Sequence, residues 1–128
     1  MTNQATPPPK TYDDQNIFAK ILRGEIPNNT AFENEYVLAF HDITPQAPLH
    51  ILIIPKGAYI DIHDFSSHAS PTEIAAFYQA LSDLVEKHNL DKTGFRTISN
   101  AGVHGGQEVP HFHLHLLGGA QLGAIIAL

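Results

Sequence analysis

Three histidines at alternate positions form the part of this sequence best suited to chemistry. His111, His113 and His115 are separated by Phe112 and Leu114. Successive side chains of a β-strand point to opposite faces, so this spacing predicts three imidazoles on one face and apolar side chains on the other. Imidazole serves well as a nucleophile and as an acid or base near neutral pH. The pattern therefore predicts a chemical site on a short strand.

A metal site is one alternative for these histidines. A strand rises about 3.3 Å per residue, so His111 and His115 lie roughly 13 Å apart along it. Zinc holds its nitrogen ligands at about 2.0–2.1 Å, so the three histidines by themselves do not reach one ion. Two neighbouring histidines could bind an ion together with His50 or His104. A zinc-dependent hydrolase therefore stays open as an alternative.

Simple burial in the core is a second alternative. A lone buried histidine is common, but several buried imidazoles each need hydrogen-bond partners for both ring nitrogens. A phosphate ligand would supply acceptors for such nitrogens. We therefore expect a functional role for the group and a structural role for one member, His111.

A glycine-rich segment, residues 100–108, comes directly before the histidines and contains Gly102, Gly105 and Gly106. Glycines leave backbone N–H groups unobstructed, so such a loop can form a concavity that binds an anion. Glycines in loops also commonly serve turns. The position beside the imidazoles favours phosphate binding here.

Composition limits the binding partners and the cellular compartment that can be expected for this protein. The 128 residues are 43% hydrophobic and 16% charged, which fits one compact domain. A formal net charge of −6, with only seven basic residues, argues against a nucleic acid partner. The absence of cysteine excludes disulfides and thiol chemistry and makes the cytoplasm the expected compartment. No apolar run approaches the roughly 20 residues that a membrane span needs, so no membrane partner is expected.

The two ends of the chain differ in character. Residues 1–14 are polar and then rich in proline, without a signal-peptide pattern, so we expect a flexible arm there. Residues 15–128 are expected to form a single domain. The apolar tail from Leu122 to Leu128 is expected to be buried against this protein or a second copy of it.

Two helices and five strands are predicted around the histidines. One helix covers about residues 15–23, with Asp14 as its N-cap and Gly24 at its end. Ser70 and Glu73 form a capping-box pattern, so a second helix begins there and runs to about His88. Runs of β-branched and aromatic residues predict strands at 30–33, 36–41, 49–54, 95–99 and 111–117. Residues 49–54 are apolar enough to be buried on both faces. Short connections favour antiparallel pairing and an α+β fold.

The histidine run resembles the signature of the histidine triad superfamily, in which three histidines alternate with hydrophobic residues. Residues 16–21, 39–50 and 54–56 further resemble its Hint branch of nucleoside phosphoramidases. Gly118-Gly119 after the run is also similar to that branch, whereas the Fhit branch of diadenosine polyphosphate hydrolases tends to continue with Pro-Arg. The resemblance implies a homodimer whose five-stranded antiparallel sheets join edge to edge. The 70–88 helix and the 95–99 strand would then lie near the interface.

The resemblance also implies a role for each matching residue. His113 matches the nucleophile that attacks the α-phosphorus and carries the nucleotidyl group. His115 and His50 match the imidazoles that contact the phosphate and support proton transfer, and His111 matches a largely structural member. Asp42 matches the acid that binds the ribose hydroxyls. Further nucleotide contacts are implied for Ile17, Phe18, Ile21, Phe40, His41, Ile43, Asn100, Gly106, Gln107 and Glu108.

These roles imply a hydrolase that cleaves the P–N bond of adenosine 5′-phosphoramidates to AMP and an amine, with no metal and no cofactor. One alternative is a nucleotide-binding regulatory or scaffold protein with incidental turnover, and another is a dinucleoside polyphosphate hydrolase. Glu108 stands where animal-type Hint proteins have a serine near the scissile bond. The tail also lacks their Trp-containing ending, so the leaving-group preference stays open.

Overall fold

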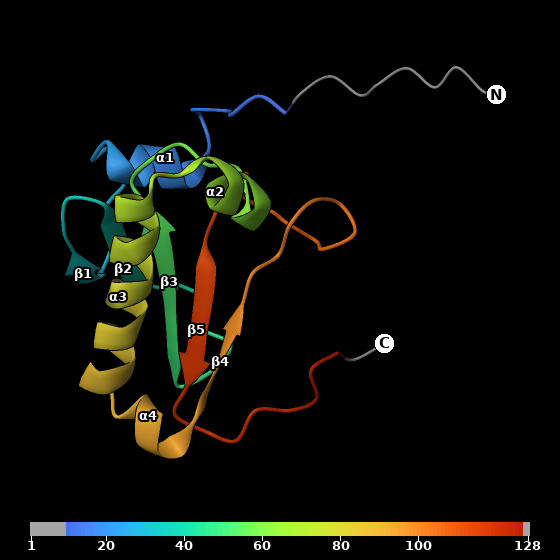
Figure 1. Ribbon diagram of the computed structural model, residues 1–128. Coiled ribbons are helices and arrows are strands. Elements are labelled where there is room, and N and C mark those ends of the chain that lie inside the picture. Colours follow the sequence, from blue (N-terminus) through green and yellow to red (C-terminus); the bar gives the residue numbers. More distant parts are fainter. Residues whose placement is uncertain (1–9, 127–128) are drawn as a thin grey trace.

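A five-stranded antiparallel sheet forms the centre of the computed structural model, which describes residues 10–126 (Figure 1). The strands are β1 (Thr30–Glu33), β2 (Val37–His41), β3 (Leu49–Pro55), β4 (Phe95–Ile98) and β5 (Leu114–Gly118). Their order across the sheet is β1-β2-β3-β5-β4. The chain thus places the strand that carries His115 directly beside the strand that carries His50. The antiparallel α+β prediction is confirmed.

Four helices accompany the sheet in the described part of the chain, whereas the sequence predicted two. They are α1 (Ile17–Leu22), α2 (Ile62–His68), α3 (Pro71–Lys87) and α4 (Leu90–Thr93). The additional helices, α2 and α4, are short, and each buries a single side chain, Phe65 and Leu90 respectively. Neither presents the repeated apolar spacing that predicts a helix from sequence. Each of these two helices therefore forms because tertiary packing buries one anchor residue.

The predicted ends of α1 and α3 are largely confirmed. Ser70 and Glu73 form the capping box of α3, with the Ser70 side chain accepting from the Glu73 N–H. Gly24 follows α1 with a φ of +78°, a conformation that glycine adopts at little cost. The predicted N-cap of α1 was wrong: Asn16, not Asp14, caps the helix and accepts from the Ala19 N–H at 2.9 Å.

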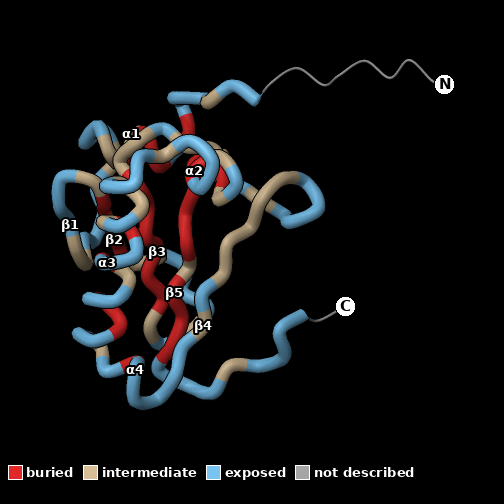
Figure 2. The backbone as a smooth tube through the Cα atoms, viewed as in Figure 1, coloured by how far each residue is buried: buried red, intermediate tan, exposed pale blue. Residues whose placement is uncertain are grey.

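The two faces of the sheet bury different clusters. Figure 2 shows the central strands β3 and β5 almost wholly buried. On one face α3 packs against Ile51, Ile53, Phe112 and Leu116. On the other face α1 packs its own apolar side chains against Phe40, Leu52 and neighbours. The prediction that β3 is buried on both faces is confirmed, because every residue from His50 to Pro55 is buried.

The fifth strand is shorter at its start than predicted, because it begins at Leu114 rather than at residue 111. Before that point the chain leaves the ladder, and the Phe112 N–H donates to the carbonyl of Tyr59 at 2.7 Å. The side chains still alternate, with Phe112 in the α3 core and His113 on the opposite side. The predicted separation of imidazoles from the apolar row therefore holds although the first two histidines lie outside the strand.

The chain ends are described only in part. Residues 1–9 of the expected flexible arm and residues 127–128 of the apolar tail lie outside the described residues. Ile125 and Ile126 are 87% and 70% exposed, so this part of the tail is not buried against its own chain. Within residues 10–126, none of the helices has both the length and the apolar character to span a membrane.

Candidate active site

An open cavity of about 460 Å³ lies over the end of the sheet where the histidines meet α1. His113 and His115 line it, and their ring centroids are 5.1 Å apart. Phe18 of α1 packs its ring against the His113 ring at 4.9 Å in an edge-to-face arrangement. His111 is fully buried behind them and does not line the cavity.

The proton positions of His111 and His113 follow from their backbone partners. A carbonyl oxygen only accepts, so the ring nitrogen that faces it must carry a proton. Nδ1 of His113 lies 2.7 Å from the His111 carbonyl, and Nε2 of His111 lies 2.8 Å from the Pro55 carbonyl. When neutral, His113 therefore has a protonated Nδ1 and an unprotonated Nε2. The lone pair of that Nε2 is available to a ligand in the cavity.

The tautomers of His50 and His115 follow in the same way. The backbone N–H of Gln46 donates to Nδ1 of His50 at 3.0 Å, so neutral His50 carries its proton on Nε2. That Nε2 lies 2.9 Å from Nδ1 of His115, which must accept the hydrogen bond. Neutral His115 consequently keeps its proton on Nε2. Strand register explains the contact, because His50 pairs with Leu117, diagonally next to His115.

Burial keeps all four imidazoles neutral near pH 7. It lowers the pKa of His111 and of His115 to about 4, and neighbouring histidines contribute in the same direction. Burial also lowers the pKa of His113 and of His50, although the carboxylate of Asp42 opposes the shift in both. Desolvation disfavours the charged form of a base, which is the physical cause of each shift. The site therefore presents uncharged imidazoles, the form that is nucleophilic.

Asp42 lies at the polar edge of this group. One of its carboxylate oxygens accepts from the Thr44 N–H at 2.8 Å, and the other lies 3.5 Å from Nε2 of His50. Its backbone N–H donates to the His50 carbonyl, which ties the turn after β2 to the start of β3. Asp42 also lines the cavity, so its carboxylate is presented to a ligand.

Asp42, His50 and His115 place possible metal-ligand atoms within 4.8 Å of one another. Metal coordination by histidine needs an unprotonated nitrogen. Nε2 of His50 carries a proton because the Gln46 N–H already occupies Nδ1. Coordination through that nitrogen would force two donors to face each other at Nδ1. The arrangement therefore opposes a metal at these three residues, and His104 is exposed in the glycine-rich loop, outside this group.

The cavity gathers nearly all residues for which the sequence implied nucleotide contact. Those that line it are Ile17, Phe18, Ile21, Phe40, His41, Asp42, Ile43, Asn100, Gly106, Glu108, His113 and His115. The sequence reasoning missed six others that also line it, namely Ile26, Pro27, Asn28, Asn29, Leu52 and Val109. Residues 26–29 follow α1 directly, and their turn-forming composition gave no signal beyond a connection.

Gln107, like His50, was predicted to contact the ligand but does not line the cavity. Its side-chain amide donates to the carbonyls of Ile60 and Val109 at 2.6 and 3.0 Å, and its oxygen accepts from the Gly102 N–H. The backbone N–H groups of Gly106 and Gln107 donate to carbonyls within the loop. These groups therefore brace the loop, and the expected anion binding by this segment stays a prediction for its other backbone N–H groups.

Comparison with known proteins agrees with this geometry. The HIT domain family matches residues 23–122. An uncharacterised HIT-like protein of Azospirillum brasilense is 51% identical over 117 residues, which cover 91% of this chain and 96% of that protein. The purine nucleoside phosphoramidase of Escherichia coli is 40% identical over 114 residues, covering 89% and 95%. A solved histidine triad protein from Clostridium difficile is 37% identical, covers 91% of this chain and 100% of its own, and superposes with a TM-score of 0.78. The chain belongs to the HIT domain family.

Proposed function

We propose that this protein is a hydrolase that cleaves the P–N bond of adenosine 5′-phosphoramidates, and of related purine nucleoside phosphoramidates, to AMP and an amine. The observation that carries the proposal is the unprotonated Nε2 of a neutral His113 at the wall of a cavity of about 460 Å³. Similarity to a purine nucleoside phosphoramidase supports the choice of substrate class.

In the first step Nε2 of His113 attacks the α-phosphorus. An N–P bond forms, the P–N bond to the amine breaks, and the amine leaves after it gains a proton from water. The His113 ring becomes positively charged because it keeps its Nδ1 proton. The His111 carbonyl, 2.7 Å from Nδ1, stabilises that charge as it develops.

In the second step the hydroxide left from that water attacks the same phosphorus and the bond to His113 breaks, which releases AMP and restores the neutral ring. One water is consumed: its oxygen and one hydrogen end on the phosphate and its other hydrogen ends on the amine. Two easier displacements replace one difficult one. The Nε2–H of His115, held in place by His50, donates to a phosphate oxygen through both steps.

The remaining contacts position the nucleoside. The carboxylate of Asp42 accepts from the ribose hydroxyls, and the apolar wall of Ile17, Phe18, Ile21 and Phe40 holds the purine. Glu108, which is exposed at the cavity, faces the leaving amine and favours amines that carry positive charge nearby. No step requires a metal or a cofactor.

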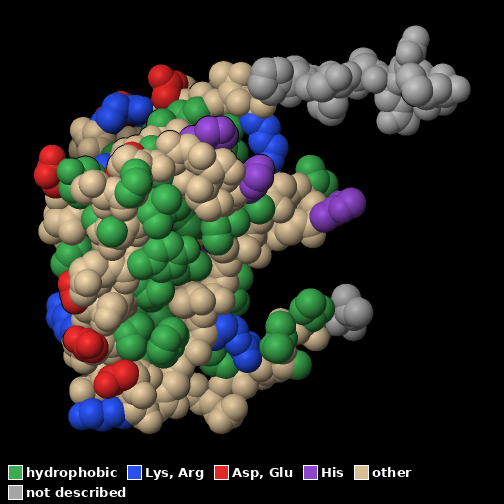
Figure 3. Space-filling model, in the orientation of Figure 1, with side chains coloured by type: hydrophobic (Ala, Val, Ile, Leu, Met, Phe, Trp, Pro, Cys, Tyr) green, Lys and Arg blue, Asp and Glu red, His purple; other side chains and the backbone are tan. Residues whose placement is uncertain are grey.

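We also propose that the protein acts as a homodimer paired through the free edge of β4. The outer edge of β4 has no partner strand in the described chain, and Phe95 of β4 is 46% exposed. Figure 3 shows a hollow on this side between two projecting segments, the glycine-rich loop and the C-terminal segment. A second copy would cover the open edge. Light scattering at micromolar concentration should give twice the chain mass, and a monomeric mass would contradict the pairing.

The test of the activity is turnover of a tryptamine or lysine-type adenosine 5′-phosphoramidate, with diadenosine polyphosphate and a nucleotidyl sugar as comparison substrates. Rapid acid-free quenching and mass spectrometry of peptides should find AMP on His113. The His113→Ala variant should lose about 10³-fold or more in kcat. His68→Ala, at a histidine whose side chain is 70% exposed on α2, is the matched control and should turn over normally. Normal turnover by His113→Ala, or tight AMP binding with no turnover of any substrate, would refute the proposal.

A further inference from the structure

The segment before α1 reaches the back of the histidine group. The hydroxyl of Tyr12 lies 2.6 Å from Nδ1 of His111, and the two rings meet edge to face with centroids 5.6 Å apart. These residues are 99 positions apart in the chain, so only the fold brings them together. Tyr12 does not line the cavity. Any effect of this side chain on a bound ligand is therefore indirect, and the hydrogen bond to His111 is the contact that leads toward the cavity histidines.

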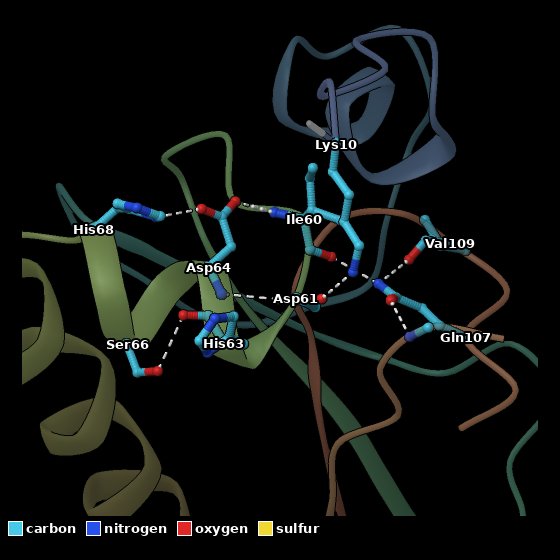
Figure 4. Close-up of polar contacts among 10 residues, drawn as sticks. Lys10, Ile60, Asp61, His63, Asp64, Ser66, His68, Gln107 and Val109 are labelled. Carbon is cyan, nitrogen blue, oxygen red and sulfur yellow. Dashed lines mark hydrogen bonds and ion pairs between the residues drawn. The ribbon is translucent and has the colours of Figure 1, made fainter. Parts of the chain in front are cut away.

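A second contact holds the same segment in place. The ammonium group of Lys10 lies 3.1 Å from a carboxylate oxygen of Asp61, which is only 4% exposed. Figure 4 shows Lys10 reaching down to Asp61 at the start of α2, beside the Gln107 amide that bonds to Ile60 and Val109. Asp61 is itself held, because it caps α2 through the Asp64 N–H. Residues 10–12 are thus fastened at one end to the start of α2 and at the other end to His111.

The direction of the Tyr12 hydrogen bond is fixed by the rest of the group. Nε2 of His111 donates to the Pro55 carbonyl, so its Nδ1 is the acceptor and the phenol must donate. Burial raises the pKa of Tyr12, which keeps the phenol protonated and able to donate. Both nitrogens of a fully buried imidazole are therefore satisfied, and without Tyr12 one would be an unpaired acceptor.

We propose that Tyr12 is a positioning residue that locks the His111 ring, and through the His111 carbonyl holds the Nδ1–H and the orientation of His113. A chain of three hydrogen bonds carries the effect: Tyr12 to His111, His111 to Pro55, and His113 back to the His111 carbonyl. The role of His113 as nucleophile rests on the function proposed above. The lock on the two rings is a separate physical claim.

The test is the Tyr12→Phe variant of the full chain, which removes the hydroxyl and keeps the ring. Long-range ¹H–¹⁵N spectra of the histidine rings report which nitrogens carry protons and which accept hydrogen bonds. We expect the His111 Nδ1 signal to move toward that of a free unprotonated nitrogen and the His113 signals to shift or broaden. With phosphoramidate substrate, kcat should fall by about three- to tenfold while KM changes by less than about twofold. Tyr78→Phe, at a tyrosine 47% exposed on α3, is the matched control and should alter neither.

The spectra and the kinetics separate two kinds of failure. Unchanged His113 signals together with an unchanged kcat in Tyr12→Phe would overturn the positioning role. An equal loss in Tyr78→Phe would also overturn it, because the effect would then belong to general stability. If the wild-type protein shows no phosphoramidase activity, the proposed function fails, and the ring spectra still decide whether Tyr12 holds His111 and His113.

Discussion

His50 donates its Nε2–H to Nδ1 of His115 across 2.9 Å, between two residues that are 65 positions apart. The backbone N–H of Gln46 sets this direction by occupying the other nitrogen of His50. The consequence is that His115 presents an N–H, rather than a lone pair, from its Nε2. His113 presents the opposite, a lone pair from its Nε2. Neighbouring imidazoles of the same residue type therefore present opposite groups, which are the groups that the proposed donor and nucleophile roles require.

Removing the His50 side chain should impair turnover without removing the nucleophile. In His50→Ala the tautomer of His115 is no longer fixed, and its Nε2–H is lost from part of the population. We expect kcat to fall about tenfold or more, with AMP still found on His113 after quenching. Single-turnover kinetics measure the effect. His63→Ala, a change outside the cavity on α2, should leave kcat unchanged; a His50→Ala enzyme with wild-type kcat would contradict the tautomer argument.

The rate should hold at mildly acidic pH. Burial lowers the pKa of His113, so at pH 6 more of it stays neutral and nucleophilic than an exposed histidine with its ordinary pKa of about 6.5 would. The acid limb of the kcat/KM profile, measured from pH 4.5 to 8, should therefore have its midpoint below 6.5. A midpoint at or above 6.5 would mean that His113 is not the group whose neutral form is required.

Glu108 should influence both the pH profile and the choice of amine. Its negative charge raises the pKa of His113 in opposition to burial, so Glu108→Gln should move the acid limb to lower pH. The same variant should also discriminate less between leaving amines. We expect kcat/KM for a cationic amine, divided by kcat/KM for a neutral amine, to fall by about two- to fivefold. Glu86→Gln, on the exposed side of α3, is the matched control. An unchanged amine preference in Glu108→Gln would place Glu108 away from the leaving group.

Stability should fall in acid. The pKa of His111 is about 4 in the folded protein and about 6.5 in the unfolded chain, so the unfolded state binds the extra proton between these values. The free energy of unfolding is therefore fully maintained above pH 6.5 and decreases as pH falls toward 4. His111 alone contributes up to about 3 kcal/mol of this decrease. Urea unfolding at pH 7.5, 6 and 5 measures it, and His68→Ala should keep the same slope. A free energy of unfolding that is equal at pH 7.5 and pH 5 would refute the burial argument.

Chelation should not affect turnover. The proton on Nε2 of His50 opposes coordination at Asp42, His50 and His115, and the proposed steps use only imidazoles, a backbone carbonyl and water. Dialysis against a strong chelator, followed by metal analysis of the protein, should leave kcat within about 20% of the starting value. Loss of activity that returns with one equivalent of zinc would instead establish a metalloenzyme.

Much of the sheet and of the candidate site could be predicted from short-range patterns. The alternating histidines, the alternation of Phe112 and Leu114, and the capping box at Ser70 each rest on the fixed geometry of a strand or a helix end. The short helices α2 and α4 were not predictable in this way, because one buried anchor in each is visible only after the chain has packed. The start of β5 at Leu114, later than predicted, was not predictable for the same reason, because it depends on a carbonyl that Tyr59 supplies from another loop.

The sequence by itself determined which residue types could react, because side-chain chemistry and strand alternation do not depend on distant contacts. Only the tertiary structure decided which nitrogen of His111 and which nitrogen of His115 carries a proton. Those protons follow from partners far away in the chain: Pro55 and Tyr12 for His111, and His50 for His115. A tautomer is set by whether a donor or an acceptor lies within about 3 Å, and that distance is fixed only when strands, loops and the segment before α1 are packed together.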